Sequence, residues 1–387
     1  MFGFRFGPPK FSLGVDIGSS ALKYVMLKKG KTGPEVVAAG IESYPEGVFV
    51  DGIMQDPNAI SQMIKNIKKE QNLKFEQVFT SIASQNTILR FLPLPEMEDE
   101  ELKHAIEGEA EQYVPYPLET VNLNFARLAK VEQDGTTRLL CLLAVAQKEQ
   151  VESIVGIFRS VGVKQLDALD IDSLAIINSL EKFMKRKSGP DDVVAEEGDE
   201  PMGTMSGVGS SPDIGDDEVV AIVCIGARST IINVLKGHVL RFSRNVQISG
   251  NNITEVIRSV YKFTFSEAET TKIEKSVASV QGEVDQEFLD VVHTTIEEIA
   301  GEIRRSFDYF KAQHREPLIH RVILTGGTAK IKDIDKLLSS ELSVEVVLGD
   351  PSVGILRALP NEDSFIENLQ QYSVAIGLAL RGVEAND

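Results

Sequence analysis

The sequence predicts an α/β protein made of two related lobes, and three observations support this prediction. A strand, a glycine-containing turn and a second strand are expected at residues 11–27, and the same order recurs at residues 223–235. Both copies continue into a similar Leu-Lys-Gly sequence, at Leu27–Gly30 and Leu235–Gly237. A repeat on this scale indicates a duplicated domain. The β-β-β-α-β order of the first copy indicates a mixed sheet covered by a helix.

Each element of the first lobe has a local signal. Its predicted strands are Phe11–Ile17, Ala21–Leu27, Val36–Ile41 and Val78–Ala83. Asp56 and Pro57 mark the cap and the first position of a helix whose apolar side chains share one face.

A subdomain of mixed helix and strand is predicted at residues 86–165, inserted after the fourth strand. Its predicted elements are a strand at Thr87–Leu92, a helix at Glu98–Tyr113, strands at Leu123–Val131 and Leu139–Ala146, and a helix at Lys148–Val161. A further helix is expected at Leu174–Met184. Asp170 and Asp172 stand before this helix, and we interpret them as helix caps, with a role as catalytic acids as the alternative.

The second lobe adds helices to the repeated strands. They are expected at Asn251–Lys262, Ser266–Ser276 and Asp285–His314. A strand at Arg321–Thr325 then runs into paired glycines, and another helix starts at Lys332. The last helix, Tyr372–Leu380, consists largely of small residues and can pack closely against a neighbour.

The composition is that of a globular protein and excludes several function classes. The chain has 387 residues, 40 Lys and Arg against 58 Asp and Glu, and a formal net charge of −18. This acidity argues against nucleic-acid binding, because phosphate contacts depend on clustered Lys and Arg. Two cysteines and five scattered histidines form no disulfide framework or zinc motif. Every apolar run is too short to cross a bilayer, so we expect a cytoplasmic protein without a membrane span.

Much of the charge imbalance comes from one segment. Residues 189–218 contain ten acidic residues, nine Gly or Pro, and no Lys, Arg or aromatic residue. Such a composition buries too little apolar surface to offset the entropy of ordering the chain. We expect a disordered acidic linker here.

The first glycine turn has the residues of a phosphate-binding loop. Backbone N–H groups of Gly18, Ser19 and Ser20 can point into one concavity and bind phosphate oxygens. Glycine suits this position because a Cβ atom would block close approach. Lys23 supplies a positive charge for a β- or γ-phosphate, and Asp16 can hold Mg²⁺ through water. An ordinary hairpin with a Gly-Ser turn is the alternative interpretation.

Two later segments strengthen the phosphate-binding interpretation. Gly226 begins the glycine turn of the repeated hairpin, so the two halves would clamp a polyphosphate from both sides. Residues Thr325–Thr328 end a strand with the paired glycines Gly326 and Gly327. Their backbone leaves room for a purine or its ribose phosphate to approach.

This order of motifs resembles the superfamily of actin and the heat-shock ATPases, in which a nucleotide with Mg²⁺ lies between two related halves. The resemblance implies an actin-like two-lobed α/β fold with duplicated ribonuclease H-like halves. The inserted α+β subdomain is similar to that of the cell-division protein FtsA. The implied subdomains are 1A (1–85, completed by 166–187 and 365–380), 1C (86–165), and a second lobe at 219–387 made of 2A (about 219–250 and 318–364) and 2B (about 251–317).

Further segments narrow the resemblance to the PilM family of type IV pilus assembly proteins. They are Arg90–Pro95, Glu109–Pro117 and Arg241–Arg244, followed by Gly250 and Thr254. The resemblance implies an ATP-binding scaffold that captures the cytoplasmic N-terminal tail of the membrane protein PilN in a groove between 1A and 1C. It also implies recruitment to the inner membrane through partners, indirect links to PilO and the pilus motor ATPases, and self-association.

The resemblance also implies which residues contact ATP or ADP. They are Asp16, Gly18, Ser19, Ser20 and Lys23 on the first turn; Gly226, Ser229 and Thr230 on the second; Gly250, Glu269 and Lys272 beyond it; and Gly326, Gly327 and Thr328 on the adenosine side. Asp16 would lie near Mg²⁺. Glu269 and Lys272 share a helix face, where they would contact the ribose and adenine. An exposed, ion-paired helix is the alternative interpretation of that pair.

One residue departs from the superfamily pattern. The second phosphate motif usually begins with Asp, and this chain has Cys224. A neutral thiol is a poor ligand for Mg²⁺, which prefers oxygen. We therefore expect ATP to bind with slow hydrolysis or none. The structural alternative is that Cys224 is simply a small, buried strand residue.

Two other functions of this superfold are alternatives. A small-molecule kinase would need a carboxylate base and a polar substrate pocket in the cleft, and the sequence presents no convincing base. An FtsA-like filament tethered to a membrane would need a basic amphipathic helix at its C-terminus. Residues 377–387 contain one basic residue, which argues against such tethering.

Overall fold

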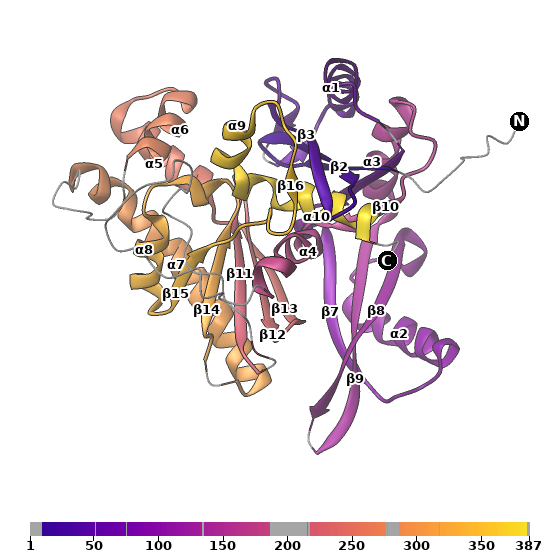
Figure 1. Ribbon diagram of the computed structural model, residues 1–387. Helices are drawn as coiled ribbons and strands as arrows, with labels where there is room; N and C mark the ends of the chain where they lie inside the picture. Colours follow the sequence, from indigo (N-terminus) through magenta and orange to yellow (C-terminus); the bar gives the residue numbers. More distant parts are fainter. Residues whose placement is uncertain are drawn as a thin grey trace, which may run out of the picture.

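The computed structural model describes residues 10–384, except residues 51, 75, 134, 186–214, 216, 276, 278–285 and 317. The predicted acidic linker, 189–218, lies outside the described residues apart from positions 215, 217 and 218. Two mixed sheets with helices against them form the body of the molecule, and a smaller three-stranded sheet extends away from it (Figure 1).

The first sheet has six strands in the order β10-β6-β1-β2-β3-β16. Their bounds are β1 Phe11–Ile17, β2 Ala21–Lys29, β3 Pro34–Ser43, β6 Gln77–Ile82, β10 Ala168–Ile171 and β16 Leu356–Arg357. The four predicted strands are confirmed as β1, β2, β3 and β6. Strand β2 runs antiparallel to β1 and β3, whereas β6 and β10 continue the sheet in parallel from β1.

The second sheet repeats this arrangement with five strands in the order β13-β12-β11-β14-β15. Their bounds are β11 Val219–Ile225, β12 Thr230–Lys236, β13 Val239–Val246, β14 Arg321–Thr325 and β15 Glu345–Leu348. The antiparallel and parallel pairs follow in the same sequence as in the first sheet. The two lobes therefore share one topology, as the repeated hairpin predicts.

Two helices, α4 (Asp172–Met184) and α10 (Ser373–Glu384), connect the lobes. Ile176 and Leu180 of α4 join a core cluster with β11 and β12, while Ala375 of α10 packs against the first sheet. The other face of β11 meets a different set of helices. Strand β11 is apolar throughout because both of its faces are buried.

The small residues of α10 permit close packing, as predicted. A Cβ atom on Gly377 would lie 1.8 Å from the Ala175 carbonyl oxygen of α4. One on Gly14 of β1 would lie 2.1 Å from the Ala375 carbonyl oxygen. Glycine at both contacts lets α10 approach a helix of one layer and a strand of the next.

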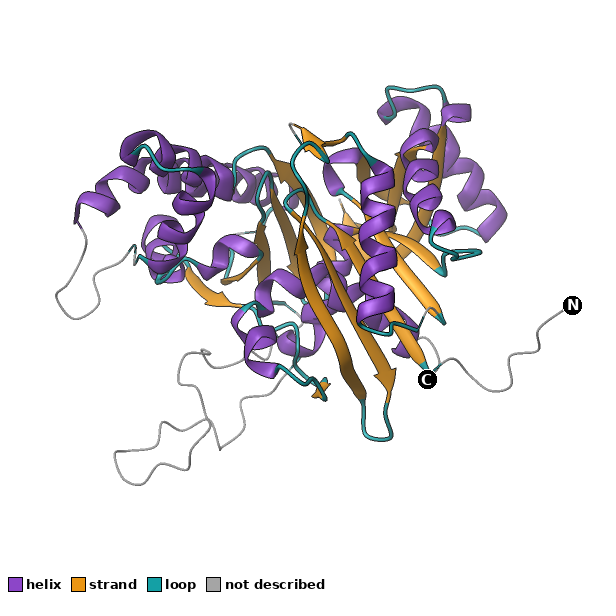
Figure 2. Cartoon of the chain, turned by 90° about the horizontal axis from the view of Figure 1, so that it is seen from above, coloured by secondary structure: helices purple, strands orange, loops and turns teal. Residues whose placement is uncertain are grey.

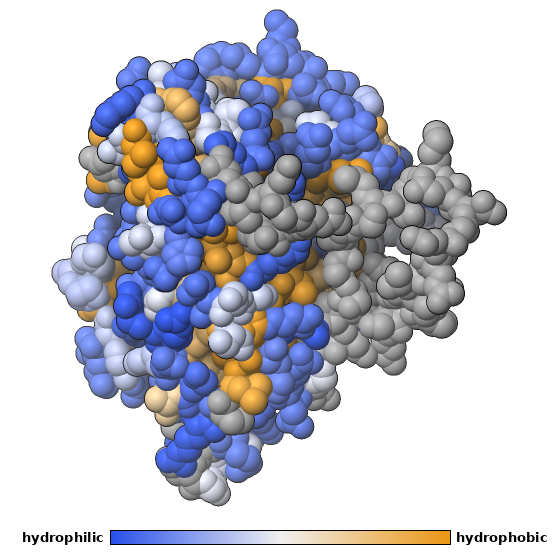
Figure 3. All heavy atoms as spheres, turned by 90° about the vertical axis from the view of Figure 1, so that its left-hand side faces the viewer, coloured by the Kyte–Doolittle hydropathy of each residue, from blue (hydrophilic) through white to orange (hydrophobic). Residues whose placement is uncertain are grey.

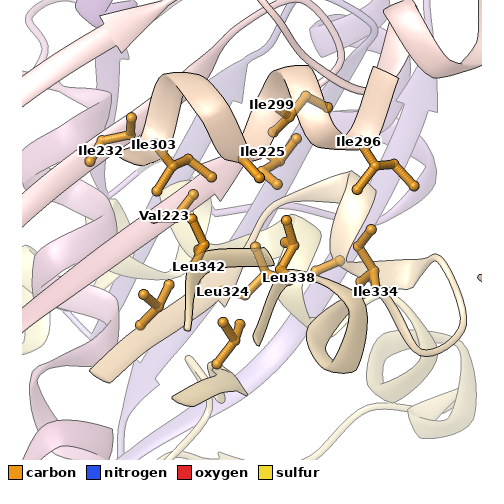
Figure 4. Packing of buried hydrophobic residues seen from close by; sticks show 14 of the residues in the cluster. Val223, Ile225, Ile232, Ile296, Ile299, Ile303, Leu324, Ile334, Leu338 and Leu342 are labelled. Atoms are coloured by element: carbon orange, nitrogen blue, oxygen red, sulfur yellow. The ribbon is translucent and has the colours of Figure 1, made fainter. Parts of the chain in front are cut away.

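Other helices cover the opposite faces of the two sheets (Figure 2). On the first sheet these are α1 (Pro57–Glu70), which the Asp56 side chain caps as predicted, and α3 (Lys148–Ser160). On the second lobe they are α5 (Gly250–Tyr261), α6 (Phe265–Glu274), α7 (Gln286–His314) and α8 (Ile334–Leu342). Figure 4 shows α7 and α8 meeting Val223 and Ile225 of β11 through isoleucine and leucine side chains.

The inserted subdomain is a three-stranded sheet with one helix and its own core. Its elements are β7 (Thr87–Leu94), α2 (Asp99–Tyr113), β8 (Val121–Gln133) and β9 (Thr136–Gln147), with strand order β7-β9-β8. The predicted subdomain limit at residue 165 includes α3, but Ile157 and Phe158 of α3 are buried in the core of the first lobe. The limit is corrected to the end of β9; the other subdomain boundaries stay predictions.

Several short elements have no counterpart in the sequence prediction. They are a hairpin of β4 (Phe49–Val50) and β5 (Ile53–Met54), and a helix α9 (Glu362–Glu367). Strands β10, β15 and β16 also lacked a clear periodic signal, because each has four residues or fewer. Among the residues that the structure describes, each helix is too short or too polar to cross a lipid bilayer.

Candidate functional site

A cleft with a volume of about 1250 Å³ lies where the two lobes meet. The β1–β2 turn and the β11–β12 turn contribute to its lining, together with α6 and the segment that follows β14. Twelve of the predicted nucleotide-contacting residues line it, namely Asp16, Gly18, Ser19, Ser20, Lys23, Gly226, Ser229, Glu269, Lys272, Gly326, Gly327 and Thr328. The fold thus brings together motifs from three distant parts of the chain.

The first turn carries a cross-strand ion pair. Asp16 and Lys23 are opposite each other in the β1–β2 register, and Lys23 Nζ lies 3.0 Å from Asp16 Oδ2. Both side chains are largely buried, so their charges are screened less than those of a surface pair. A Cβ atom on Gly18 would lie 2.8 Å from Lys23 Nζ. The absence of a side chain at Gly18 therefore leaves room above the turn for the Lys23 ammonium group.

The second turn presents mainly backbone. The Gly226 N–H donates to the Ser229 carbonyl oxygen (3.0 Å), and the Gly226 carbonyl accepts from Gly250 N–H (3.0 Å) and the Thr328 hydroxyl (3.3 Å). In the register of this hairpin, Cys224 is opposite Ile231. The second hairpin therefore repeats the backbone of the first without its ion pair.

Two predicted contact residues do not line the cleft, and the prediction for them is corrected. Thr230 is fully buried, and its hydroxyl donates to the Ile248 carbonyl oxygen (2.7 Å). Gly250 lies behind the turn, where a Cβ atom would come within 2.4 Å of the Thr328 hydroxyl oxygen. Both residues support the second turn, and strand and helix packing hides them from a ligand.

Lys272 is buried on α6 and forms a network with the half-buried Glu269. Lys272 Nζ lies 2.5 Å from Glu269 Oε1 and also donates to the Thr254 hydroxyl oxygen (2.8 Å) and the Gly250 carbonyl oxygen (3.3 Å). Burial lowers the pKa of Lys272, and the Glu269 carboxylate opposes that shift. The alternative of an exposed ion-paired helix is wrong for Lys272, whose side chain is 6% exposed.

The third motif, Thr325–Thr328, joins the second lobe to α10, one of the two helices that connect the lobes. Gly326 has φ of +90°, and a Cβ atom there would lie 2.6 Å from the Ile225 carbonyl oxygen. Its N–H donates to the carbonyl oxygen of Gln370, in the short helix before α10 (3.1 Å). The Thr325 and Ser373 hydroxyls are hydrogen-bonded at 2.5 Å. Movement of this turn is therefore coupled directly to the start of α10.

Asp172 is a cleft residue whose role the capping interpretation missed. The N-cap of α4 is Ile171, and Asp170 pairs with Arg381 of α10. Asp172 lines the cleft, and its Oδ1 accepts from the backbone N–H of Ser84 (2.8 Å) and of Ser173 (2.7 Å). Asp172 directly follows β10, which pairs in parallel with β6, so the two strands end side by side. Recognition of β10 in the sequence would therefore have placed Asp172 next to the end of β6.

The environment of Asp172 changes its protonation. Burial raises its pKa to about 7, hydrogen bonds from Ser84 oppose the shift, and the charge of Asp16 adds to it. Burial likewise raises the pKa of the Cys224 thiol to about 12, with Asp172 and Asp16 contributing. Cys224 is therefore a neutral thiol at physiological pH and supplies no charge to the cleft.

The donors in the cleft fit a magnesium ion held through water and phosphate. Asp16 and Asp172 are carboxylates that line the same cavity, and the pKa of Cys224 is sensitive to both charges. Mg²⁺ typically keeps several waters and binds one or two carboxylates plus substrate phosphates. Asp16 and Asp172 would hold such an ion, and the ion would neutralise charge on the phosphates.

A family model described as type IV pilus assembly protein PilM matches residues 14–195 and 205–383. The match covers nearly all of the chain. This protein belongs to the PilM family. The resemblance noted from the Arg90–Pro95 and Glu109–Pro117 segments is thereby confirmed.

Solved structures confirm the actin-like fold. One described as the PilM-PilN type IV pilus biogenesis complex is 27% identical, with a TM-score of 0.76 over 96% of this chain and 98% of that chain. MreB 5 of Spiroplasma citri bound to AMPPNP is 12% identical, with a TM-score of 0.52 over 97% of this chain and 96% of that one. At that identity the MreB structure shows the fold alone.

Two bacterial proteins of other families are also similar to this chain. The cell division protein FtsA of Staphylococcus epidermidis (strain RP62A) is 19% identical over 373 residues, covering 88% of this chain and 75% of that protein. The cell shape-determining protein MreB of Pasteurella multocida is 25% identical over 159 residues. That match spans 33% of this chain and 45% of that MreB.

Proposed function

We propose that this PilM-family protein is an ATP-binding scaffold that captures the cytoplasmic N-terminal tail of PilN. The observation that carries the proposal is the 27% identity, over 96% of the chain, to the structure described as a PilM-PilN complex. PilN would recruit the scaffold from the cytoplasm to the inner membrane and connect it with PilO and the pilus motor ATPases. Self-association of the scaffold belongs to the same proposal.

The nucleotide part of the proposal rests on the three motifs that line the cleft. Lys23 and the N–H groups of residues 18–20 would bind phosphate oxygens from one side, and the turn at Gly226 would approach them from the other. Glu269 on α6 would contact the ribose, because Lys272 is already bound to protein acceptors. Asp16 would hold Mg²⁺ through water.

Contacts between the lobes offer a route by which nucleotide could alter the scaffold. The buried Asn233 side chain of β12 donates to the Ser173 carbonyl oxygen of α4 (3.1 Å), next to Asp172. The Gly326 turn contacts the Gln370 carbonyl oxygen before α10. A ligand that binds one lobe arrangement better than another shifts the population toward it. We therefore propose that ATP sets the lobe angle, which governs the PilN groove.

The inserted subdomain has side chains suited to a peptide partner. Tyr113 and Tyr116, at and just beyond the end of α2, are 42% and 43% exposed. The Arg90 guanidinium lies 5.8 Å from the Tyr113 ring centroid. Tyrosine and arginine are enriched among residues that dominate protein binding energies. We propose that these residues contribute to capture of the PilN tail.

The test is a pull-down with an immobilised peptide of the PilN N-terminal tail, run with ATP, with ADP and without nucleotide. We expect the wild-type protein to bind, with different amounts captured in the three conditions. Tyr113→Ala should weaken capture, whereas Tyr309→Ala on α7, an exposed tyrosine of the second lobe, should not. Absence of capture in all conditions would overturn the PilN proposal, and equal capture would remove only the nucleotide switch.

A second candidate function, phosphoryl transfer to a small molecule, is favoured by one observation. The cleft contains Asp172, a carboxylate with a pKa of about 7 that could accept a proton from a hydroxyl group. ADP formation that requires an added low-molecular-weight fraction of a cell extract would support this candidate. ADP formation with water alone would support slow hydrolysis.

A further inference from the structure

The outer side of the second lobe holds a group of potential metal ligands far from the glycine turns in sequence. His293 and Glu297 lie on α7, and Glu341 lies near the end of α8. One ligand atom from each residue lies within 4.8 Å of the other two. Within the described part of the chain, no other group of three His, Cys, Asp or Glu residues converges this closely.

The two helices hold these side chains in register. His293 and Glu297 are four positions apart, so they occupy one face of α7, with 3.4 Å between His293 Nδ1 and Glu297 Oε2. Glu341 Oε1 approaches His293 Nε2 from α8 at 3.9 Å. Ile296 and Ile299 of α7 face α8 across the core next to this group (Figure 4), which fixes the spacing of the helices.

A neighbouring arginine orients the carboxylate from α8. Arg304 donates to the Glu341 backbone carbonyl oxygen (2.7 Å), and its guanidinium lies 3.8 Å from Glu341 Oε2. The second carboxylate oxygen, Oε1, is the one that faces His293. Metal-binding carboxylates are commonly oriented by a partner outside the ligand set, and here Arg304 is in ion-pair range of Glu341 Oε2 while its hydrogen bond goes to the backbone carbonyl.

The donor set indicates the class of ion. One imidazole nitrogen and two carboxylate oxygens suit Zn²⁺, which takes nitrogen and oxygen ligands at about 2.0–2.2 Å and completes four-coordination with water. Mg²⁺ and Ca²⁺ prefer oxygen ligands alone. The three side chains are between 23% and 50% exposed, so an ion can reach them from solvent. Glu297 approaches Nδ1 of His293 and Glu341 approaches Nε2, and an ion bonds one ring nitrogen only, so closing the site requires rotation of the imidazole or of one glutamate side chain.

We propose that His293, Glu297 and Glu341 form a Zn²⁺ site that joins α7 to α8. Because α8 follows the turn at Gly326, the ion would fasten the long helix of the second lobe to the segment behind the adenosine side of the cleft. The side of the molecule that carries these helices is mainly hydrophilic (Figure 3), as an ion site open to solvent requires. The proposal is independent of PilN and of ATP.

The test uses the full chain without a histidine tag, treated with a chelator, dialysed, and titrated with ZnCl₂ by calorimetry in the absence of nucleotide. We expect one saturable site and a zinc-dependent rise in Tm. His293→Ala should weaken binding by about 100-fold or more, and Arg304→Gln by roughly tenfold, since outer partners typically contribute 10- to 100-fold in affinity. Co²⁺ in place of Zn²⁺ should give a visible absorption band that His293→Ala removes.

The chain offers a matched control in His104 of α2. Its Nδ1 lies 3.6 Å from Glu107 Oε2, but within the part of the chain that the structure describes no third ligand joins them. His104→Ala should leave affinity, stoichiometry and the Co²⁺ band unchanged. The proposal is overturned if the wild type shows no saturable zinc binding, or if His293→Ala binds as tightly as the wild type. His104 is exposed and His293 is half-buried, and circular dichroism without zinc will verify that both variants fold.

Discussion

The two glycine hairpins of this protein have the same backbone and different side chains at one register position. In the first hairpin that position holds Asp16 opposite Lys23, and in the second it holds Cys224 opposite Ile231. Each pair is the second from its turn in the strand register, and both turns line the cleft. The two hairpins share a backbone arrangement, but the ion pair at this register position is present in the first hairpin and is replaced by Cys224 and Ile231 in the second.

This difference indicates how the cleft divides its tasks. The first hairpin carries the Asp16–Lys23 ion pair, whereas the second has a neutral thiol at the position of Asp16 and places Arg228 of its turn in the cleft lining. An Asp at position 224 would place a third carboxylate near Asp16 and Asp172, both of which already act on the pKa of Cys224. With Cys224 at this position, we expect the cleft to bind ATP firmly and to activate water weakly.

Removal of the positive group from the first hairpin should have the largest effect. Lys23→Ala deletes a charged phosphate donor, and hydrogen bonds to charged groups contribute about 1.5–3 kcal/mol. We expect ATP affinity, measured by calorimetry, to fall roughly tenfold to hundredfold. Lys28→Ala is the matched control. Lys28 lies on β2, as Lys23 does, and pairs with Glu35 of β3 at 3.1 Å, but it does not line the cleft. Equal losses in both variants would contradict a special role for Lys23.

Substitution of the adjacent Gly326 and Gly327 tests how closely the backbone behind the second hairpin is packed. An added Cβ at Gly326 would lie 2.6 Å from the Ile225 carbonyl oxygen and 3.0 Å from Cys224 Sγ, in a conformation with positive φ. At Gly327 the nearest atom would be at 3.7 Å. Gly326→Ala should lower the free energy of unfolding by about 1–3 kcal/mol in urea denaturation, and Gly327→Ala should have little effect. Similar stabilities for the two variants would show that the turn adapts.

The missing carboxylate of the second hairpin can be supplied by Cys224→Asp. We expect ATP turnover, measured as phosphate release with Mg²⁺, to rise several-fold, because an oxygen ligand would help to place the metal and the attacking water. Cys224→Ser is the control of similar size without a charge. Unchanged turnover in Cys224→Asp, with ATP binding retained, would mean that this position does not limit hydrolysis.

A pH-dependent effect on stability is expected from Asp172, which lies close to both hairpins. Its carboxyl has a pKa of about 7 in the folded protein and near 4 in an unfolded chain. Between these values the folded state binds the extra proton, so this group makes the wild type lose stability as pH rises from about 4 to 7. Asp172→Asn keeps an oxygen that can accept from Ser84 and Ser173 and should remove this slope.

The measurement is urea denaturation at a series of pH values. The free energy of unfolding of Asp172→Asn minus that of the wild type should increase between pH 4 and pH 7 and level off above it. Parallel curves for the two proteins would contradict the raised pKa of Asp172.

Much of the fold can be predicted from local patterns. Strands β1 and β2 and helix α1 have long apolar or amphipathic signals, and Asp56 caps α1 as its position before Pro57 indicates. The short strand β10 has no such signal, and without it Asp172 looks like a helix cap. Helix α3 was placed in the inserted subdomain because it follows β9, but its Phe158 packs beside α1 in the first lobe. Proximity in sequence does not determine on which core a helix packs.

The candidate site likewise has some features that local sequence predicts and others that depend on the packing of distant segments. The glycine turns and their polar residues are local features, so the chain order of Asp16, Lys23, Gly226 and Gly326 is sufficient to indicate a phosphate clamp. The burial of Thr230 and Gly250 depends on contacts with Ile248 and Thr328, which come from other segments. Sequence alone therefore cannot separate the residues that line the cleft from those that support it.

Local sequence patterns are sufficient to predict the repeated hairpin, the PilM-family motifs and the charged groups at the first turn. These depend on neighbouring residues and on strand periodicity, which are short-range properties. The packing of distant segments is needed to show that Asp172 lines the cleft with a raised pKa, and that His293 of α7 meets Glu341 of α8. Burial and electrostatic interaction depend on distances in space, and packing of the helices against the sheets sets those distances.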